Sequence, residues 1–492
     1  MDRRTFLVRT ALAAGAGLVG GCRRDSDVPE RRAPAPSTGR VREHRLTVAP
    51  TEFDLGGGPP FRVLSYNGSV PGPEIRAAEG DTVRVVVQNQ LDEGTTIHWH
   101  GLPVPNRMDG VPDVTQEPIA PGSSFTYEFG AYPAGTYVYH SHVGYQLDQG
   151  LHGAIVIEPR QSVGHDREFV LALEDWATID GGGPSASRAG RVDTGMMGGG
   201  GMMGGRGMMG GRMGGMMRRR TPRDGDPLQQ PRYDVYAVNG KHASAAAPLK
   251  VRKGDKVRLR ILNPSSGTTY LVRLAGHRLA VTHADGRPVR PVSVDVLRIG
   301  MGERYDAEFI ADNPGRWPLL VQPADTRHEA EPLQIVLYEG ITSRTVSTDS
   351  RTDLQTLRYD DLNALPEDGV PSVGSRTDRT VRLQLSGGMM GSAFWTINGN
   401  RYPDTEDVKV DQGERVRLEY FNMSMMAHPM HLHGHFFEVD APGRPRKDTV
   451  LVPAHMGRVA IEFIADNPGK WLHHCHNLYH HMAGMANVVR VA

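Results

Sequence analysis

The chain contains 492 residues, of which 56 are basic and 56 acidic, so its net charge is close to zero. This balance gives no polyanion-binding signature, and nucleic acid is not expected as a partner. The 59 glycines and 35 prolines, with no long apolar-periodic runs, favour strands and turns over helices. No segment reaches the roughly 20 apolar residues that a membrane-spanning helix needs, and the length suggests about three domains.

Residues 1–39 predict an export signal and a tether. Arg3 and Arg4 precede Phe6 and an Ala/Gly-rich stretch, which resembles a twin-arginine signal and predicts export to the periplasm or cell envelope. Cys22 follows Leu-Val-Gly-Gly, so it is either a lipidated first mature residue or part of a leader that is cleaved a little further on. Cys475 is then the one cysteine of the folded part, which excludes an internal disulfide there and leaves a thiol that a metal could occupy.

Three segments along the chain repeat one pattern. They are "EFGAYPAGTYVYHSH" from residue 128, "EFIADNPGRWPLLVQ" from residue 308 and "EFIADNPGKWLHHCH" from residue 462. Upstream of each lie an Asn-Gly turn signal and a run of alternating apolar residues, the pattern of β-strands joined by turns. We predict an all-β protein of three tandem sandwich domains at 40–160, 165–340 and 375–492, with a linker at 341–374.

Histidines are paired in the first and third copies only. Residues two apart on a strand point to the same face, so each His-x-His pair aims two imidazoles in one direction. The middle copy has only single histidines, including His277, His283 and His328, and is predicted to be structural. Eight converging imidazoles would hold several metal ions, and neutral imidazole suits copper, zinc, iron or nickel. The pairs are His98/His100, His140/His142, His431/His433 and His474/His476.

Strand alternation separates the side chain of Cys475 from those of the two histidines beside it. Since His474 and His476 face one way, Cys475 between them faces the other and can serve a second metal centre. A nitrogen–sulfur site with a weak axial methionine is the blue-copper electron-transfer pattern. It would consist of His428, Cys475, His480 and Met485. Electrons reaching that site would have a covalent path through Cys475 to either flanking histidine.

The segments "HWHG", "HSH", "HPMHLHGHFF" and "HCHNLYHHMAGM" resemble the four copper-binding motifs of the multicopper oxidases, which include laccases and bacterial cuprous oxidases. The resemblance implies three cupredoxin-like Greek-key domains and four copper ions. It implies that four one-electron oxidations reduce dioxygen to water. The implied ligands are His428, Cys475, His480 and Met485 for type 1 copper, His98 and His431 for type 2, and His100, His140 and His476 with His142, His433 and His474 for the type 3 pair.

Proton delivery is less defined by the sequence. Asp109 matches the acidic residue beside the family's copper cluster and is a candidate proton relay, with a turn-stabilising Asp-Gly as the alternative. His481 stands where several bacterial relatives carry glutamate, so either His481 or another acid relays protons. His435 is expected to support the cluster, and His473 to lie behind it or at the surface.

Residues 195–217 form a Met/Gly-rich insertion that is too rich in glycine for a stable helix. Thioethers favour Cu(I), and the cuprous-oxidase branch has such insertions, so we interpret this one as a loop that collects Cu(I). Five nearby arginines, and Ser424 where cuprous oxidases often have aspartate, favour the alternative of a glycine-rich spacer. The methionines of the possible Cu(I) site are Met196, Met197, Met202, Met203, Met208, Met209, Met423, Met425 and Met426.

The sequence therefore predicts an exported, monomeric multicopper oxidase whose electron donor is Cu(I), a phenolic compound, or both. The alternative from another functional class is a protein of copper tolerance that sequesters Cu(I) without turnover. Dioxygen is the expected electron acceptor.

Overall fold

The computed structural model describes residues 37–161, 164–178, 230–324, 330–367, 372–374, 376–388 and 394–492. The predicted signal and most of the tether, Cys22, His328, and the insertion at 195–217 with its six named methionines lie outside the described residues. Within them the chain is all-β, as predicted. No helix of this part is long and apolar enough to cross a membrane.

The first domain has two four-stranded sheets, ordered β2-β1-β4-β6 and β3-β8-β7-β5. The strands are β1 Val41–Phe53, β2 Phe61–Tyr66, β3 Gly72–Ala78, β4 Thr82–Asn89, β5 His98–His100, β6 Ser124–Gly130, β7 Gly135–His140 and β8 His152–Glu158, with the 3₁₀ helix η1 at Asn106–Met108.

The middle domain has a six-stranded sheet, β10-β9-β12-β17-β14-β15, and a five-stranded sheet, β11-β19-β18-β13-β16. The strands are β9 Arg167–Trp176, β10 Val235–Val238, β11 Leu249–Val251, β12 Lys256–Leu262, β13 Tyr270–Leu274, β14 Leu279–Ala284, β15 Arg287–Val294, β16 Leu297–Ile299, β17 Arg304–Ile310, β18 Arg316–Pro323 and β19 Glu331–Tyr338.

The third domain repeats the middle one, with sheets β21-β20-β23-β28-β25-β26 and β22-β30-β29-β24-β27. The strands are β20 Arg379–Gly387, β21 Trp395–Ile397, β22 Val408–Val410, β23 Arg415–Asn422, β24 His428–Leu432, β25 Phe437–Val439, β26 Arg446–Lys447, β27 Thr449–Val452, β28 Arg458–Ile464, β29 Gly469–Cys475 and β30 Ala486–Val491. Its one helix is α1, Leu478–Met482.

Equivalent strands pair in the same way in all three domains. β1 with β4, β9 with β12, and β20 with β23 are parallel pairs. β4 and β23 alternate strictly between half-buried and buried residues, the period expected of a strand with one face on a core. The Asn-Gly signals at 67–68, 239–240 and 398–399 all have positive φ at both residues, the conformation of a tight hairpin turn.

A related Pro/Gly stretch followed by an aromatic residue closes one turn in each domain: it reads Pro-Ala-Gly-Thr-Tyr in the first domain and Asn-Pro-Gly-x-Trp in the other two. Trp317 Nε1 donates to Asn313 O and Trp471 Nε1 to Asn467 O, both at 2.7 Å, and Tyr137 OH donates to Pro133 O at 2.8 Å. In each case the aromatic side chain returns to the carbonyl four residues earlier, which fixes the start of a central strand. The same sequence pattern therefore recurs because it makes the same contact three times.

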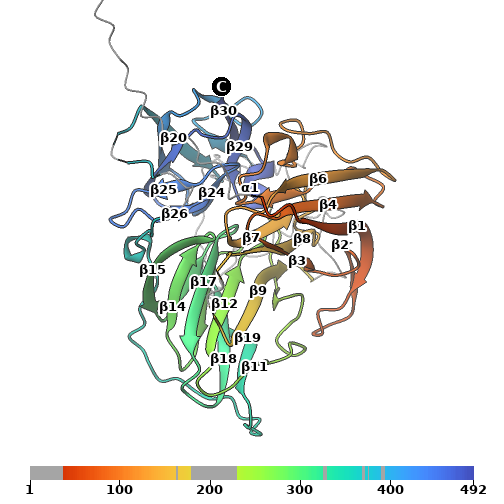
Figure 1. Cartoon of the computed structure of the whole chain (residues 1–492), viewed down its shortest axis with the longest axis vertical. Helices are drawn as coiled ribbons and strands as arrows, with labels where there is room; N and C mark the ends of the chain where they lie inside the picture. Colours follow the sequence, from red (N-terminus) through yellow and green to blue (C-terminus); the bar gives the residue numbers. More distant parts are fainter. Residues whose placement is uncertain are drawn as a thin grey trace, which may run out of the picture.

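The described part of the linker packs on the middle domain. Leu357 and Leu362 are buried in that domain's core, on either side of the 3₁₀ helix η3, Tyr359–Asp361. Figure 1 shows the third domain (blue) beside the first (orange), with the middle domain (green) against both. The first and third domains thus meet face to face, and their junction is where the paired histidines lie.

Candidate metal centre

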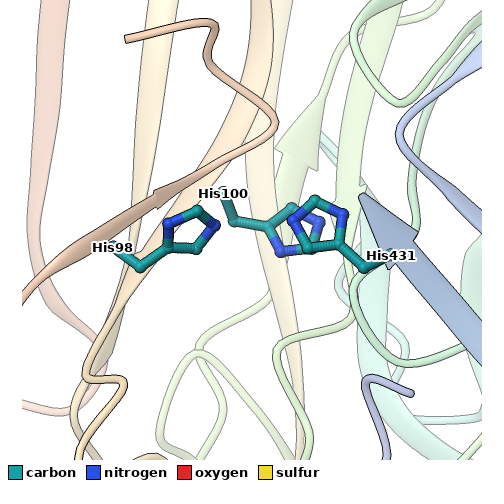
Figure 2. A group of neighbouring side chains, drawn as sticks. All are labelled: His98, His100 and His431. Carbon is teal, nitrogen blue, oxygen red and sulfur yellow. The ribbon is translucent and has the colours of Figure 1, made fainter. Parts of the chain in front are cut away.

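The four His-x-His pairs occupy neighbouring strands at the junction of the first and third domains. Residue 98 is paired with residue 140 across β5 and β7, and residue 431 with residue 474 across β24 and β29. Backbone pairing therefore places histidines from different pairs side by side. Figure 2 shows His98 and His100 from the first domain facing His431 from the third, and the rings of His100 and His431 stack at 3.8 Å between centroids.

All eight paired histidines come together into one cluster, which we call the histidine cluster. It contains three groups in which one ligand atom of each residue lies within 4.8 Å of the others. The groups are His98 with His100 and His431, His100 with His140 and His476, and His142 with His433 and His474. No residue of the middle domain belongs to a group of this kind in the part of the chain that the structure describes.

Backbone carbonyls orient four of these eight rings. A carbonyl oxygen only accepts hydrogen bonds, so an imidazole nitrogen beside one must carry the proton. Such contacts run from His98 Nδ1 to Asp109 O (2.8 Å), His140 Nδ1 to Ser141 O (2.9 Å), His431 Nδ1 to Asp448 O (2.8 Å) and His474 Nδ1 to Cys475 O (2.9 Å). Each ring, when neutral, therefore presents a bare Nε2 to its neighbours.

The bare nitrogens have no protein partner. The Nε2 atoms of His98, His140 and His431 are buried and lack a hydrogen bond. His433 Nε2 and His474 Nε2 face each other at 3.1 Å. Unpaired buried acceptors are costly, so the bare Nε2 atoms of His98, His140 and His431 call for a cation between them.

Burial favours the neutral form of seven of these imidazoles, and the neutral form is the one that binds metals. It is the largest cause lowering their pKa, and the neighbouring imidazoles lower it further; for His476 the pKa falls to about 3. The pKa is likewise lowered for His100, His140, His142, His431, His433 and His474.

A second group, which we call the cysteine group, lies on the other face of β29. Cys475 Sγ is 3.6 Å from the Nδ1 atoms of both His428 and His480, and these two nitrogens are 3.1 Å apart. Asn477 caps α1 by accepting from Tyr479 N and His480 N, which directs His480 towards the thiol. Burial raises the pKa of the Cys475 thiol.

Met485 borders the cysteine group. It is fully buried, and its backbone carbonyl accepts a hydrogen bond from Cys475 N at 3.0 Å. The centroid of the Trp395 ring lies 3.8 Å from that of the His480 ring. Ser424, at the position of the expected aspartate, is buried, and its Oγ lies 2.7 Å from His428 Nε2.

Asp109 and His481 both lie against the histidine cluster. Asp109 is fully buried; its Oδ2 is 2.9 Å from His433 Nδ1 and its Oδ1 3.2 Å from His98 Nδ1. Burial raises the pKa of Asp109, although His98 opposes the shift. The His481 ring is 4.4 Å from His474 and lines a small opening together with residues of the cluster.

Four other histidines that were considered in the sequence make ordinary structural contacts. His435 Nδ1 donates to His433 O, directly behind the cluster. His473 is fully buried, away from the surface, between Tyr420 OH at 2.8 Å and Asn487 Oδ1 at 2.7 Å. In the middle domain His277 Nε2 lies 2.7 Å from Tyr338 OH, and His283 borders Asp306.

Comparison with known proteins assigns the family. Three family models, each described as multicopper oxidase, match residues 47–162, 215–340 and 376–492. Multicopper oxidase MmcO of Mycobacterium tuberculosis is 37% identical over 99% of this chain and 96% of its own length. The chain belongs to the multicopper oxidase family.

Other relatives of this multicopper oxidase include copper resistance proteins and laccases. A copper resistance protein A homolog of Pseudomonas syringae pv. tomato is 29% identical over 100% of this chain and 99% of its own length. The crystal structure of a laccase from Botrytis aclada superposes with a TM-score of 0.72 at 27% identity, covering 92% of this chain and 88% of that one. The three domains are thus cupredoxin-like, as the resemblance implied.

Family membership implies copper cofactors and an oxidoreductase. The residues present fit copper, because the cluster offers buried, neutral imidazoles whose bare nitrogens converge, and the cysteine group adds a thiol between two further imidazoles. The carbonyls and carboxylates behind the rings are the supporting contacts that metal-binding histidines require.

Four exposed methionines lie on two loops close to the cysteine group. Met456 was not foreseen from the sequence because it lies some thirty residues from the others. The loops are joined by hydrogen bonds from His455 N to Ser424 O (3.0 Å) and from Met456 N to Asn422 O (2.9 Å). The four are Met423 (41% exposed), Met425 (69%), Met426 (42%) and Met456 (57%). We call them the methionine surface.

Proposed function

We propose that this multicopper oxidase couples four one-electron oxidations to the reduction of dioxygen to water, with Cu(I) as its main donor and phenolic compounds as further donors. The observation that most strongly supports this proposal is the position of Cys475. Its thiol faces His428 and His480, while the adjacent His474 and His476 belong to two different groups of the histidine cluster. One strand thus links an electron-accepting group to the cluster through covalent bonds.

The proposed ligand sets start from the groups described above, with His100 assigned to the type 3 pair only and Met485 added to the cysteine group. Copper bound in them would supply one-electron redox chemistry and a site for dioxygen reduction. His428, Cys475, His480 and Met485 are assigned to type 1, His98 and His431 to type 2, and His100, His140 and His476 with His142, His433 and His474 to the type 3 pair. The total would be four ions per chain.

The protein itself would exclude bulk water and manage protons. Seven of the eight cluster histidines are buried, and His142 is partly exposed beside the small opening that His481 also lines. Dioxygen would reach the cluster at this opening. Asp109 is placed to hold a proton at Oδ1 or Oδ2 next to His98 and His433. His481 lies at the opening within ring contact of His474 and is the second candidate relay.

Cu(I) is favoured as donor by the methionine surface. Thioethers bind Cu(I) in preference to harder cations, and Ser424 connects this surface directly to His428. The relatives named for copper resistance are consistent with this donor, and the laccase relatives with phenols. The insertion at 195–217 would add further thioethers as a collecting loop.

The test is dioxygen uptake by the copper-loaded protein, driven by Cu(I) or by a phenol. Deleting residues 195–217, or replacing Met426 and Met456 by leucine, should reduce Cu(I)-driven uptake several-fold and leave phenol oxidation intact. Ile310→Ala, which alters an exposed apolar residue of the middle domain, is the control. Equal Cu(I)-driven rates in all proteins would leave a broad laccase-like oxidase.

The second candidate is a copper-tolerance protein that sequesters Cu(I) without turnover. The same exposed methionines favour it, because a thioether surface binds Cu(I) whether or not electrons move on. Dioxygen uptake separates the two: a sequestering protein would bind a fixed number of Cu(I) ions per chain and would not catalyse dioxygen consumption.

Export as a monomer completes the proposal. The N-terminal segment would direct the protein to the periplasm or cell envelope, with Cys22 as a possible lipid attachment site. Fractionation of cells that express the wild type and Cys22→Ala tests this. Release of the variant from the membrane fraction would indicate a lipid anchor, and unchanged soluble export would indicate ordinary cleavage.

A further inference from the structure

The middle domain, predicted to be structural, reaches the edge of the histidine cluster. Gly302 lies in the turn before β17 with φ +83°, and a Cβ there would be 2.9 Å from atoms of both His100 and His476. Gly101, next to His100, has φ +86°, and a side chain there would collide with Arg304 and Asp448. Both glycines are needed for close approach of the domains.

Arg304 joins all three domains. It is fully buried, and both terminal nitrogens donate to Asp448 of the third domain: Nη1 to Oδ1 and Nη2 to Oδ2, each at 2.6 Å. Its Nε donates to Thr136 O of the first domain at 3.2 Å. Asp285, also of the middle domain, accepts from the backbone nitrogens of Asp448 (3.3 Å) and Thr449 (3.2 Å).

Asp448 in turn contacts two histidines of the cluster. Its backbone carbonyl accepts from His431 Nδ1 at 2.8 Å, and its Oδ1 lies 3.1 Å from His100 Nε2. Thr449 Oγ1 donates to the same carboxylate and also lies 3.1 Å from His100 Nε2. One residue therefore sets the orientation of rings from two domains.

These contacts decide which nitrogen of His100 is free. A carboxylate that receives two charge-assisted hydrogen bonds from a guanidinium is held as an acceptor. His100 Nε2 must then be the donor, which leaves its Nδ1 bare, and that atom is buried without a partner. His100 is thus turned the opposite way to His98, His140 and His431, whose bare atom is Nε2.

We propose that Arg304 and Asp448 are positioning residues of the metal centre, which fix the orientation and tautomer of His100 and the orientation of His431. Through them the middle domain, none of whose described residues belongs to the histidine cluster, determines how the first and third domains present their histidines. The inference rests on the proposed function, because it assumes that the cluster binds copper.

A purely structural ion pair is the competing explanation, and the chain offers a matched control. Asp306 is fully buried, receives hydrogen bonds from Arg258 and Arg260, and bonds Thr136 of the first domain at 2.8 Å. It therefore joins two domains as Asp448 does. None of its partners belongs to the histidine cluster.

The experiment compares wild type, Asp448→Asn, Arg304→Lys and Asp306→Asn. Bound copper per chain, the type 2 copper signal in electron paramagnetic resonance, the blue absorption and the thermal midpoint are measured for each. We expect Asp448→Asn to keep the blue absorption and to lose copper from the cluster, with about 10- to 100-fold weaker binding there and an altered type 2 signal. Arg304→Lys, which keeps the charge and loses the paired donors, should show a smaller effect of the same kind.

Two outcomes would overturn the inference. One is a full copper content with an unchanged type 2 signal in both Asp448→Asn and Arg304→Lys. The other is an equal loss of cluster copper in Asp306→Asn, which would mean that any buried interdomain charge has this effect. If Asp448→Asn does not fold, Arg304→Lys decides by the same criteria. Failure of the proposed function is separate, because wild type itself would then lack cluster copper.

Discussion

Substitution of Lys447 most directly probes the junction of the domains on which the histidine cluster depends. Its side chain is fully buried, and Nζ lies 3.0 Å from Asp285 Oδ2 and 3.0 Å from Glu303 Oε1, both in the middle domain. Burial alone would lower the pKa of Lys447, but the charges of Asp285 and Glu303 outweigh it and raise the pKa. We therefore expect Lys447→Met to destabilise the protein by leaving two buried carboxylates without their shared cation.

The contacts that remain in Lys447→Met determine how much free energy of unfolding is lost. Removing one partner of a buried ion pair typically costs about 3–5 kcal/mol. Here Glu303 keeps Tyr359 OH (2.7 Å) and Gly300 N (2.7 Å), and Asp285 keeps Arg304 N (2.9 Å). These donors satisfy part of each carboxylate, so the lower end applies, about 3 kcal/mol.

Scanning calorimetry of the copper-free protein is the assay. A loss of about 3 kcal/mol corresponds to a fall in the thermal midpoint of roughly 6–12 °C for a cooperative unit of about 150–250 residues. Lys250→Met, at an exposed lysine of β11, is the control and should change the midpoint little. The double variant Lys447→Met/Glu303→Gln should recover part of the loss. A midpoint for Lys447→Met equal to that of Lys250→Met would refute the reasoning.

Three further predictions concern the site. Cys475→Ser should abolish the blue absorption and dioxygen uptake together; turnover at the wild-type rate would disprove the route through β29. Ser424→Ala removes the 2.7 Å contact with His428 Nε2 and should shift the blue absorption band. An unchanged spectrum would contradict a role of Ser424 in tuning the cysteine group. Burial lowers the pKa of His473 from 6.5 to about 4, so the unfolded chain takes up protons first as pH falls. The stability that this residue contributes above pH 6.5 is therefore lost as the pH falls from 6.5 to 4, and the loss amounts to about 3 kcal/mol. A thermal midpoint of the copper-free protein that does not change between pH 7 and 5 would contradict this prediction.

The sequence predicted the features that depend on local periodicity. Residues two apart on a strand share a face, so the common direction of His474 and His476, and the opposite direction of Cys475, followed from spacing alone. The Asn-Gly signals also marked real turns, because few other residues tolerate positive φ at both central positions of a tight turn.

Features that depend on contacts between distant segments could not be read in the same way. Arg304 and Asp448 lie 144 residues apart, and nothing local to either indicates that they meet at His100. Met456 lies beside the loop that carries the other three methionines only because the two loops are hydrogen-bonded to each other. The bare nitrogen of His98, His100 and His431 depends on a carbonyl or carboxylate from a distant segment, which tertiary packing brings behind the ring.

The most direct test of the account is the copper content of the purified, copper-saturated protein. Four ions per chain in wild type, and three in Cys475→Ser with the type 2 signal retained, are the expected result. A saturated wild type that holds one ion or none would contradict the assignment of the histidine cluster as a copper centre, and with it the proposed oxidase activity.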